Sequence, residues 1–240
     1  RSLRADGTAQ IGPARVGLYW QNTPSNPTGK VLGLGHLAKV VAWARQRGVV
    51  VASDECYAEL GWEGEWAYGV PSILDPRVCG GSHEGLLAVY SLSKQSNMAG
   101  YRAGFVAGDK ALVDRILAVR KHAGMIMPAP VQHAMTAALG DDQHVEEQKQ
   151  RYGRRRAVLR AAVESAGLRV DESAAGLYLW ASADEPAQTT VDRLAERGIL
   201  VAPGSFYGPG GASHVRIALT ATDERIEAAV ARLRQAPLRD

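Results

Sequence analysis

The sequence contains little cysteine and no long apolar run. Its two cysteines, Cys56 and Cys79, lie far apart, outside any CxxC pair or zinc-type histidine spacing. Neither a disulfide framework nor a zinc centre is therefore expected. No stretch approaches about eighteen consecutive apolar residues, and the first seven residues lack the apolar core of a signal peptide. These absences predict a cytoplasmic protein with no membrane partner.

The chain also lacks a block of one charge. Its formal net charge of +3 arises from 28 basic and 25 acidic residues scattered over 240 positions. The densest basic group, Arg151 with residues 154–156, is typical of a solvated helix face. No nucleic-acid partner is expected. With 46% hydrophobic residues, the chain has enough apolar side chains to form one large domain or two modest ones.

Short apolar runs predict a sheet in the first half of the chain. Residues 16–20, 49–53, 86–90 and 103–107 have the composition of buried strands. Between the first two runs, residues 34–47 show apolar side chains at helical spacing before Gly48, a glycine suited to end a helix. A strand, a helix and a second strand imply a parallel pair. An α/β fold with a mostly parallel sheet is predicted.

Helical patterns dominate after Asp109. They cover residues 111–121, a segment opened by Pro128 and Pro130, and the long charged stretch 143–166. Strand-like runs at 168–170, 177–180, 199–201 and 214–219 then alternate with helices at 189–197 and 223–234. We predict a large domain at residues 1–142, an interdomain helix at 143–166, and a small α/β domain at 167–240.

The sequence Ser91-Leu92-Ser93-Lys94 follows a predicted strand, and Arg102 comes eight residues later. A lysine amine can condense with an aldehyde, while hydroxyl and guanidinium groups bind phosphate. Together these residues indicate a phosphorylated aldehyde cofactor. Ser91 and Ser93 could instead cap a helix, which is compatible because a helix start also attracts anions. The alternative for Lys94 and Arg102 is an ordinary surface role.

Two further segments place polar groups at strand ends. Asn26 lies between Pro24 and Pro27, which should make its loop stiff and extended. Its amide can donate to the phenolic oxygen of a pyridoxal ring, although a turn-forming asparagine is the alternative. Asp54 ends a predicted strand and can keep the pyridine nitrogen protonated, with Tyr57 three residues on. A helix cap is the alternative for Asp54.

In this order, the motifs resemble those of the fold type I, class I/II aminotransferases that use pyridoxal 5'-phosphate. The family's signature elements are Asn-Pro-Thr-Gly, Asp-x-x-Tyr after a strand, Ser-x-Ser-Lys and a following arginine, and the resemblance extends over essentially the whole chain. It implies catalytic roles for Lys94, Tyr57 and Asp54. The cofactor-binding residues that we expect are Asn26, Asp54, Tyr57, Ser91, Ser93, Lys94 and Arg102.

The segment 214–219 resembles the part of the family that carries the arginine for the substrate α-carboxylate. Arg216 is the candidate, since a guanidinium forms a bidentate pair with a carboxylate. The alternative is a structural arginine paired with Asp223 or Glu224.

The motifs look most like those of actinobacterial succinyldiaminopimelate aminotransferases. This resemblance implies amino transfer among N-succinyl-LL-2,6-diaminopimelate, glutamate and 2-oxoglutarate in lysine biosynthesis. Three alternatives stay open: a carbon–sulfur lyase, a non-catalytic module that binds pyridoxal phosphate, and an inactive fragment. Family members have roughly a hundred residues or more, the size of a domain, before Asn-Pro-Thr-Gly. This chain has only 25 before Asn26 and no initiator methionine, so we expect a truncated chain that is a homodimer at full length.

Overall fold

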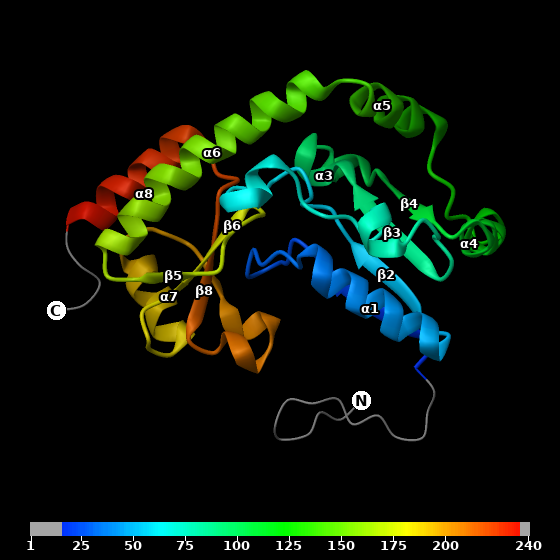
Figure 1. The fold of residues 1–240 in the computed structure, drawn as a ribbon. Helices are drawn as coiled ribbons and strands as arrows, with labels where there is room; N and C mark the ends of the chain where they lie inside the picture. Colours follow the sequence, from blue (N-terminus) through cyan, green and yellow to red (C-terminus); the bar gives the residue numbers. More distant parts are fainter. Residues whose placement is uncertain (1–15, 236–240) are drawn as a thin grey trace.

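The computed structural model describes residues 16–235, which form two sheets and the helices packed on them (Figure 1). The first sheet has the order β1-β2-β3-β4. Its strands are β1 (Leu18–Asn22), β2 (Val50–Asp54), β3 (Leu86–Ser91) and β4 (Gly104–Gly108). Strands β1, β2 and β3 are parallel, and β4 runs antiparallel to β3. The prediction of a mostly parallel sheet is confirmed.

Helix α1 (Leu34–Arg47) covers one face of this sheet (Figure 1). Leu37, Val41 and Ala44 follow the helical period and are buried, and each large aliphatic side chain contributes about 1.5–3 kcal/mol when it is fully buried. Gly48 ends the helix in the left-handed region at φ 61°, and its N–H donates to the carbonyls of Ala44 and Arg45. The predicted helix and its terminal glycine are confirmed.

The other elements of the first half are short or lie at the surface. They are η1 (Gly64–Tyr68), α2 (Pro76–Cys79), α3 (Leu92–Gln95), η2 (Ala99–Tyr101), α4 (Lys110–His122) and α5 (Ala129–Leu139). Helices α4 and α5 bury none of their residues. In β1, Trp20 is 55% exposed, so the sheet is open to solvent there.

The first sheet and its helices form the first unit, and a second sheet with its helices forms the second unit. Helix α6 (Asp142–Ser165) runs from the first unit to the second, where it packs beside α8 (Asp223–Gln235) (Figure 1). The second sheet is antiparallel in the order β5-β6-β8-β7. Its strands are β5 (Arg169–Asp171), β6 (Tyr178–Ser182), β7 (Ala202–Pro203) and β8 (His214–Ala218). Helix α7 (Ala187–Glu196) and the turns η3 (Gly204–Tyr207) and η4 (Pro209–Gly211) complete it. The domain division at residues 142 and 166 stays a proposal.

Two predictions from the apolar and charged patterns are wrong. The run 199–201 is not a strand: Ile199 and Val201 pack into the core, Leu200 is 91% exposed, and the ladder to β8 begins only at Ala202. The basic cluster is also not wholly solvated. Its members Arg155 and Arg156 pair with Asp223 and Glu63, and their side chains are only 12% and 13% exposed. Amphipathic periodicity does not distinguish packing on a core from strand pairing, or an ion pair from a solvated charge.

No helix among residues 16–235 is long and apolar enough to cross a membrane.

The segment Asn-Pro-Thr-Gly (residues 26–29) joins the two units. The N–H of Ser173 donates to Thr28 O at 2.8 Å, and that of Ala175 donates to Gly29 O at 2.9 Å. Gly29 has φ 70°, and a Cβ atom there would lie 2.5 Å from Ala175 O. Only glycine therefore permits this approach.

We predict that Gly29→Ala lowers the free energy of unfolding by about 3 kcal/mol, because it adds a strained φ and a backbone clash. Urea titration measures this loss. The matched control is Gly153→Ala within α6, where a Cβ would make an ordinary 3.6 Å contact with Trp62 and removal of a mid-helix glycine should stabilise by about 1 kcal/mol. Equal effects of the two substitutions would contradict the junction described here.

Candidate active site

Three parallel strands end at one edge of the first sheet. Asn22 pairs in register with Asp54, and Asp54 pairs with Val89, two residues before Ser91. The carboxyl ends of parallel strands are the usual ligand-binding edge of an α/β sheet. Most of the residues predicted to bind a cofactor follow this edge.

Asn22 orders the loop that carries Asn26. Its Nδ2 donates to Asp54 O at 3.0 Å, and its Oδ1 accepts from the Asn26 N–H at 2.7 Å. The peptide bonds before Pro24 and Pro27 are cis. Sequence reasoning did not single out Asn22, although a polar residue at the end of a strand in a parallel sheet is a signal that could have found it.

Asn26 and Arg216 are 190 residues apart in sequence but hydrogen-bonded, with Arg216 Nη1 donating to Asn26 Oδ1 at 2.8 Å. This bond fixes the orientation of the Asn26 amide. Its Nδ2 group, a double donor, has no partner among the described residues. Asn26 can thus still donate a hydrogen bond to a ligand, as its predicted role requires.

The Arg216 guanidinium packs against two aromatic rings and has no acidic partner among residues 16–235. Its Cζ is 4.0 Å from the ring centroid of Tyr178 and 5.1 Å from that of Tyr207. Its Nε is buried without a hydrogen-bond partner among residues 16–235. The alternative pairing with Asp223 or Glu224 is wrong, because Asp223 pairs with Arg155 and no described carboxylate lies within ion-pair distance of Arg216. A guanidinium edge that is buried and unpaired suits a carboxylate ligand.

Lys94 lies in the single turn of α3. Its Nζ is 5.9 Å from the centroid of the Tyr57 ring, and no carboxylate of the described residues lies within ion-pair distance of it. The Asp54 carboxylate acts to raise the pKa of the Cys56 thiol, and the Lys94 amine acts to lower it. Both charges therefore lie near Cys56, and among residues 16–235 they form no ion pair with each other.

Tyr57 is buried against the second unit. Its hydroxyl oxygen is 3.2 Å from that of Tyr178, and the two rings meet edge to face at 5.9 Å. Burial and this hydrogen bond raise the pKa of Tyr57 above its ordinary range, so the hydroxyl stays neutral. Asp54 Oδ1 accepts from the Cys56 N–H at 3.2 Å in a turn. Asp54 is therefore not the cap of a helix.

The three residues predicted to bind the phosphate, Ser91, Ser93 and Arg102, are not all hydrogen-bonded to one another. Ser91 caps α3: its Oγ accepts from the Ser93 N–H at 3.2 Å and lies 2.8 Å from Ser93 Oγ. The capping interpretation is confirmed for Ser91 and wrong for Ser93, which lies within α3 next to Lys94. Arg102 is exposed, has φ 54°, and donates to Ala99 O at 3.1 Å. No described hydrogen bond joins it to either serine.

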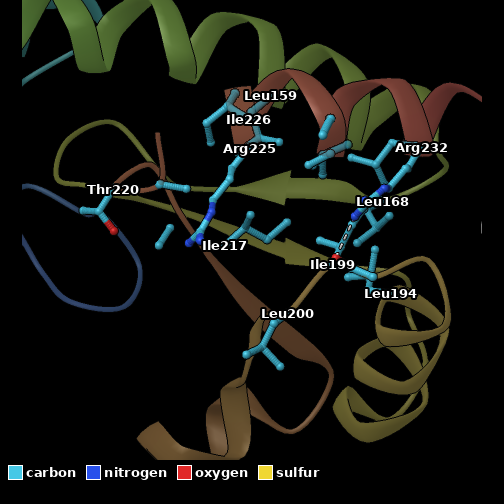
Figure 2. A pocket seen from close by; sticks show the side chains of 17 residues that line it. Leu159, Leu168, Leu194, Ile199, Leu200, Ile217, Thr220, Arg225, Ile226 and Arg232 are labelled. Atoms are coloured by element: carbon cyan, nitrogen blue, oxygen red, sulfur yellow. Dashed lines mark hydrogen bonds between the residues drawn. The ribbon is translucent and has the colours of Figure 1, made fainter. Parts of the chain in front are cut away.

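A cavity lies elsewhere in the molecule, away from this sheet edge. A cavity of about 670 Å³ opens between α6, α8 and β8, with mostly apolar side chains around it (Figure 2). Arg225 and Arg232 are its basic residues, and Arg232 donates to the carbonyl of Gly198 (Figure 2). None of the predicted site residues lines this cavity. The candidate chemistry lies instead at the sheet edge near Lys94.

Comparison with known proteins decides the family. The sequence profile of "Aminotransferase class I and II" matches residues 5–233. The chain belongs to this family. It is 63% identical over 233 residues to the probable aminotransferase Rv1178 of Mycobacterium tuberculosis, covering 97% of this chain and 55% of that protein. It is 58% identical to the 4-dedimethylamino-4-oxo-anhydrotetracycline transaminase OxyQ of Streptomyces rimosus, covering 97% of this chain and 64% of that protein.

A solved structure supports the fold. The probable N-succinyldiaminopimelate aminotransferase of Thermus thermophilus superposes with a TM-score of 0.80 at 30% identity, covering 97% of this chain and 64% of that one. The prediction of fold type I is confirmed. The chain spans less than two thirds of the length of each of these three relatives.

The residues present fit pyridoxal phosphate, the cofactor of this family. Lys94 supplies an amine outside any ion pair, and Asp54 supplies a carboxylate at the strand end. Asn26 keeps an amide donor, and Arg216 keeps a buried, unpaired Nε. Lys94 can hold the aldehyde of the cofactor, Asp54 its ring nitrogen and Asn26 its phenolic oxygen. Arg216 can hold the carboxylate of a substrate.

The reactivity of the Cys56 thiol reports on the nearby charges of Asp54 and Lys94. Burial, followed by the nearby Asp54 carboxylate, raises the pKa of the Cys56 thiol to about 12, whereas Lys94 acts to lower it. Only about one thousandth of this thiol is ionised at pH 9, so alkylation at Cys56 should be slow. Asp54→Asn should speed it by lowering the pKa, and Lys94→Ala should slow it. Peptide mass spectrometry after iodoacetamide treatment measures both rates.

Lys110→Ala, at an exposed position paired with Asp114, is the control for the lysine substitution and should leave the Cys56 rate unchanged. Shifts of the same sign for the Asp54 and Lys94 variants would show that the two charges do not flank the thiol.

Proposed function

We propose that this chain forms the catalytic part of an aminotransferase that uses pyridoxal phosphate to move an amino group from an amino acid to a 2-oxo acid. The observation that carries the proposal is the Lys94 amine, which has no ion-pair partner and lies at the same sheet edge as Asp54. Asn26 and Arg216 extend this edge toward the second unit. Membership of the aminotransferase family supports the same conclusion.

When bound, pyridoxal phosphate supplies an aldehyde for the amino group and a ring that withdraws electrons from the substrate α-carbon. Lys94 Nζ would hold the aldehyde until the amino group of the substrate displaces it. The freed amine would then take the proton from the substrate α-carbon and pass it to the aldehyde carbon of the cofactor. Asp54 holds the proton on the ring nitrogen. Asn26 Nδ2 and the neutral Tyr57 hydroxyl donate to the phenolic oxygen.

The proposed phosphate ligands are Ser91, Ser93 and Arg102. The two serine hydroxyls lie together at the start of α3, while the exposed Arg102 side chain must turn from Ala99 O to reach the same phosphate. A guanidinium on the solvent side can make this change at the modest cost of one exposed hydrogen bond.

Arg216 binds the α-carboxylate of both substrates. The rings of Tyr178 and Tyr207 pack against its guanidinium, and the bond to Asn26 fixes its orientation. A carboxylate that meets the buried Nε forms a charge-assisted bond where water cannot compete.

We propose N-succinyl-LL-2,6-diaminopimelate and glutamate as amino donors, with 2-oxoglutarate as acceptor, in lysine biosynthesis. The motif resemblance and the likeness to the Thermus structure support this choice. A second candidate is a polycyclic oxo substrate. It is favoured by the 58% identity to OxyQ and by the exposed ring of Tyr207 near Arg216. A cytoplasmic homodimer is part of the proposal.

We predict that incubation with pyridoxal phosphate followed by borohydride reduction labels Lys94, as found by peptide mapping. Lys94→Ala should abolish the label and all amino transfer while the protein stays folded. Lys110→Ala, at an exposed position, is the matched control and should keep both. A label only on other lysines would contradict the assignment.

Absorbance then separates the alternatives. A cofactor band that bleaches with glutamate and returns with 2-oxoglutarate identifies an aminotransferase, and succinyldiaminopimelate and polycyclic oxo compounds are tested in the same cycle. Release of ammonia and pyruvate from a cysteine conjugate would identify the lyase. A stable band that no amino acid changes would identify a binding module, and no band an inactive fragment.

We predict that Arg216→Ala weakens glutamate and 2-oxoglutarate binding by about 2–5 kcal/mol, the cost of removing one partner of a desolvated charge pair. Arg216→Lys should recover only part of this loss, because an ammonium group cannot form the bidentate bond. Titrating the absorbance change with each substrate measures the affinities. Labelling of Lys94 should stay normal, and unchanged affinities would exclude Arg216 as the carboxylate ligand.

A further inference from the structure

The first turns of α6 contact the residues that follow Lys94. His144 Nε2 lies 2.8 Å from Ser96 Oγ, and His144 Nδ1 lies 3.0 Å from Asp141 Oδ2. A carboxylate only accepts hydrogen bonds, so a neutral His144 carries its proton on Nδ1 and accepts from the Ser96 hydroxyl at Nε2. Asp141 is also the N-cap of α6, which ties the imidazole to the start of this helix.

A second contact lies two turns along the same helix. The Tyr152 hydroxyl donates to Asn97 Oδ1 at 3.1 Å, and the Tyr152 side chain is buried. Asn97 has φ 54°, a backbone conformation that costs energy for a non-glycine residue unless its surroundings hold it. Helix α6 therefore holds the two consecutive residues Ser96 and Asn97, which lie two and three positions after Lys94.

Helix α3 cannot fix its own orientation. It is a single turn of four residues, and the Ser96 and Met98 N–H groups both return to the carbonyl of Leu92. An isolated turn is unstable because its few hydrogen bonds do not offset the lost backbone entropy. The direction of the Lys94 side chain then depends on what holds each end of the turn. Ser91 caps the start, and within the turn Leu92 is fully buried and Gln95 accepts from the Tyr90 hydroxyl. The α6 contacts hold Ser96 and Asn97, just past the end of the turn.

We propose that His144 and Tyr152 are positioning residues, which act through Ser96 and Asn97 to aim the Lys94 amine at the cofactor aldehyde. The inference rests on the proposed function. Asp141, His144 and Ser96 form a chain of a carboxylate, an imidazole and a hydroxyl, as in a hydrolytic triad. The carboxylate of such a triad is buried, whereas the Asp141 side chain is 54% exposed. The Asp141–His144–Ser96 chain serves as a tether.

The experiment uses the whole chain and pyridoxal phosphate, and it measures the rate at which Lys94 becomes labelled. His144→Phe and Tyr152→Phe each remove one contact, and the double variant should slow labelling about tenfold, since small misplacements of a reacting group are costly. His144→Gln keeps a polar group toward Ser96 and should restore most of the rate. Ser96→Ala should have no added effect in the His144→Phe background.

The control is Arg160→Ala, which removes an ion pair from the same helix to Glu63, and it should not change the labelling rate. This control separates aiming from general loss of stability. Tyr152→Phe keeps the buried ring and decides the matter alone if His144→Phe does not fold. Normal labelling rates in folded Tyr152→Phe and His144→Phe would overturn the inference but leave the proposed function intact. No label in the unsubstituted chain would overturn both.

Discussion

The register of three parallel strands is the constraint on which the site depends. Because Asn22, Asp54 and Val89 align across β1, β2 and β3, the loops that follow these strands leave the sheet at one edge. A shift of one residue would turn Asp54 to the other face of the sheet. The buried aliphatic residues that face α1 fix this register, so packing on one side of the sheet sets the chemistry at its end.

The two units meet at this edge through polar contacts. Arg216 bonds to Asn26, Tyr57 meets Tyr178, and Gly29 accepts from the backbone of Ala175. All three contacts link the loops of the first sheet to the second unit. A ligand held between them would therefore contact both units, which explains how residues 190 positions apart can act on one substrate.

Sequence reasoning identified the helix 34–47, the parallel sheet and the family, because periodicity and local motifs report them directly. It missed Asn22, whose importance lies in contacts with Asp54 and Asn26. It also expected a strand at 199–201, where the alternation of buried and exposed residues reflects core packing. The partners of Arg155 and Arg156 were equally hidden, since pairing with Asp223 and Glu63 depends on the tertiary arrangement of α6.

The charge balance at the sheet edge explains why anionic ligands suit it. Lys94 and Arg216 bring two cations, and Asp54 is the carboxylate placed near the lysine. The neighbouring Tyr57 and Cys56 have raised pKa values, chiefly through burial, and stay neutral near pH 7. Neither can neutralise the cations. Because Arg216 is partly desolvated without an acidic partner, its attraction for a carboxylate is stronger than at the surface. In the proposed function, Lys94 takes the covalent role and Arg216 recognises the substrate.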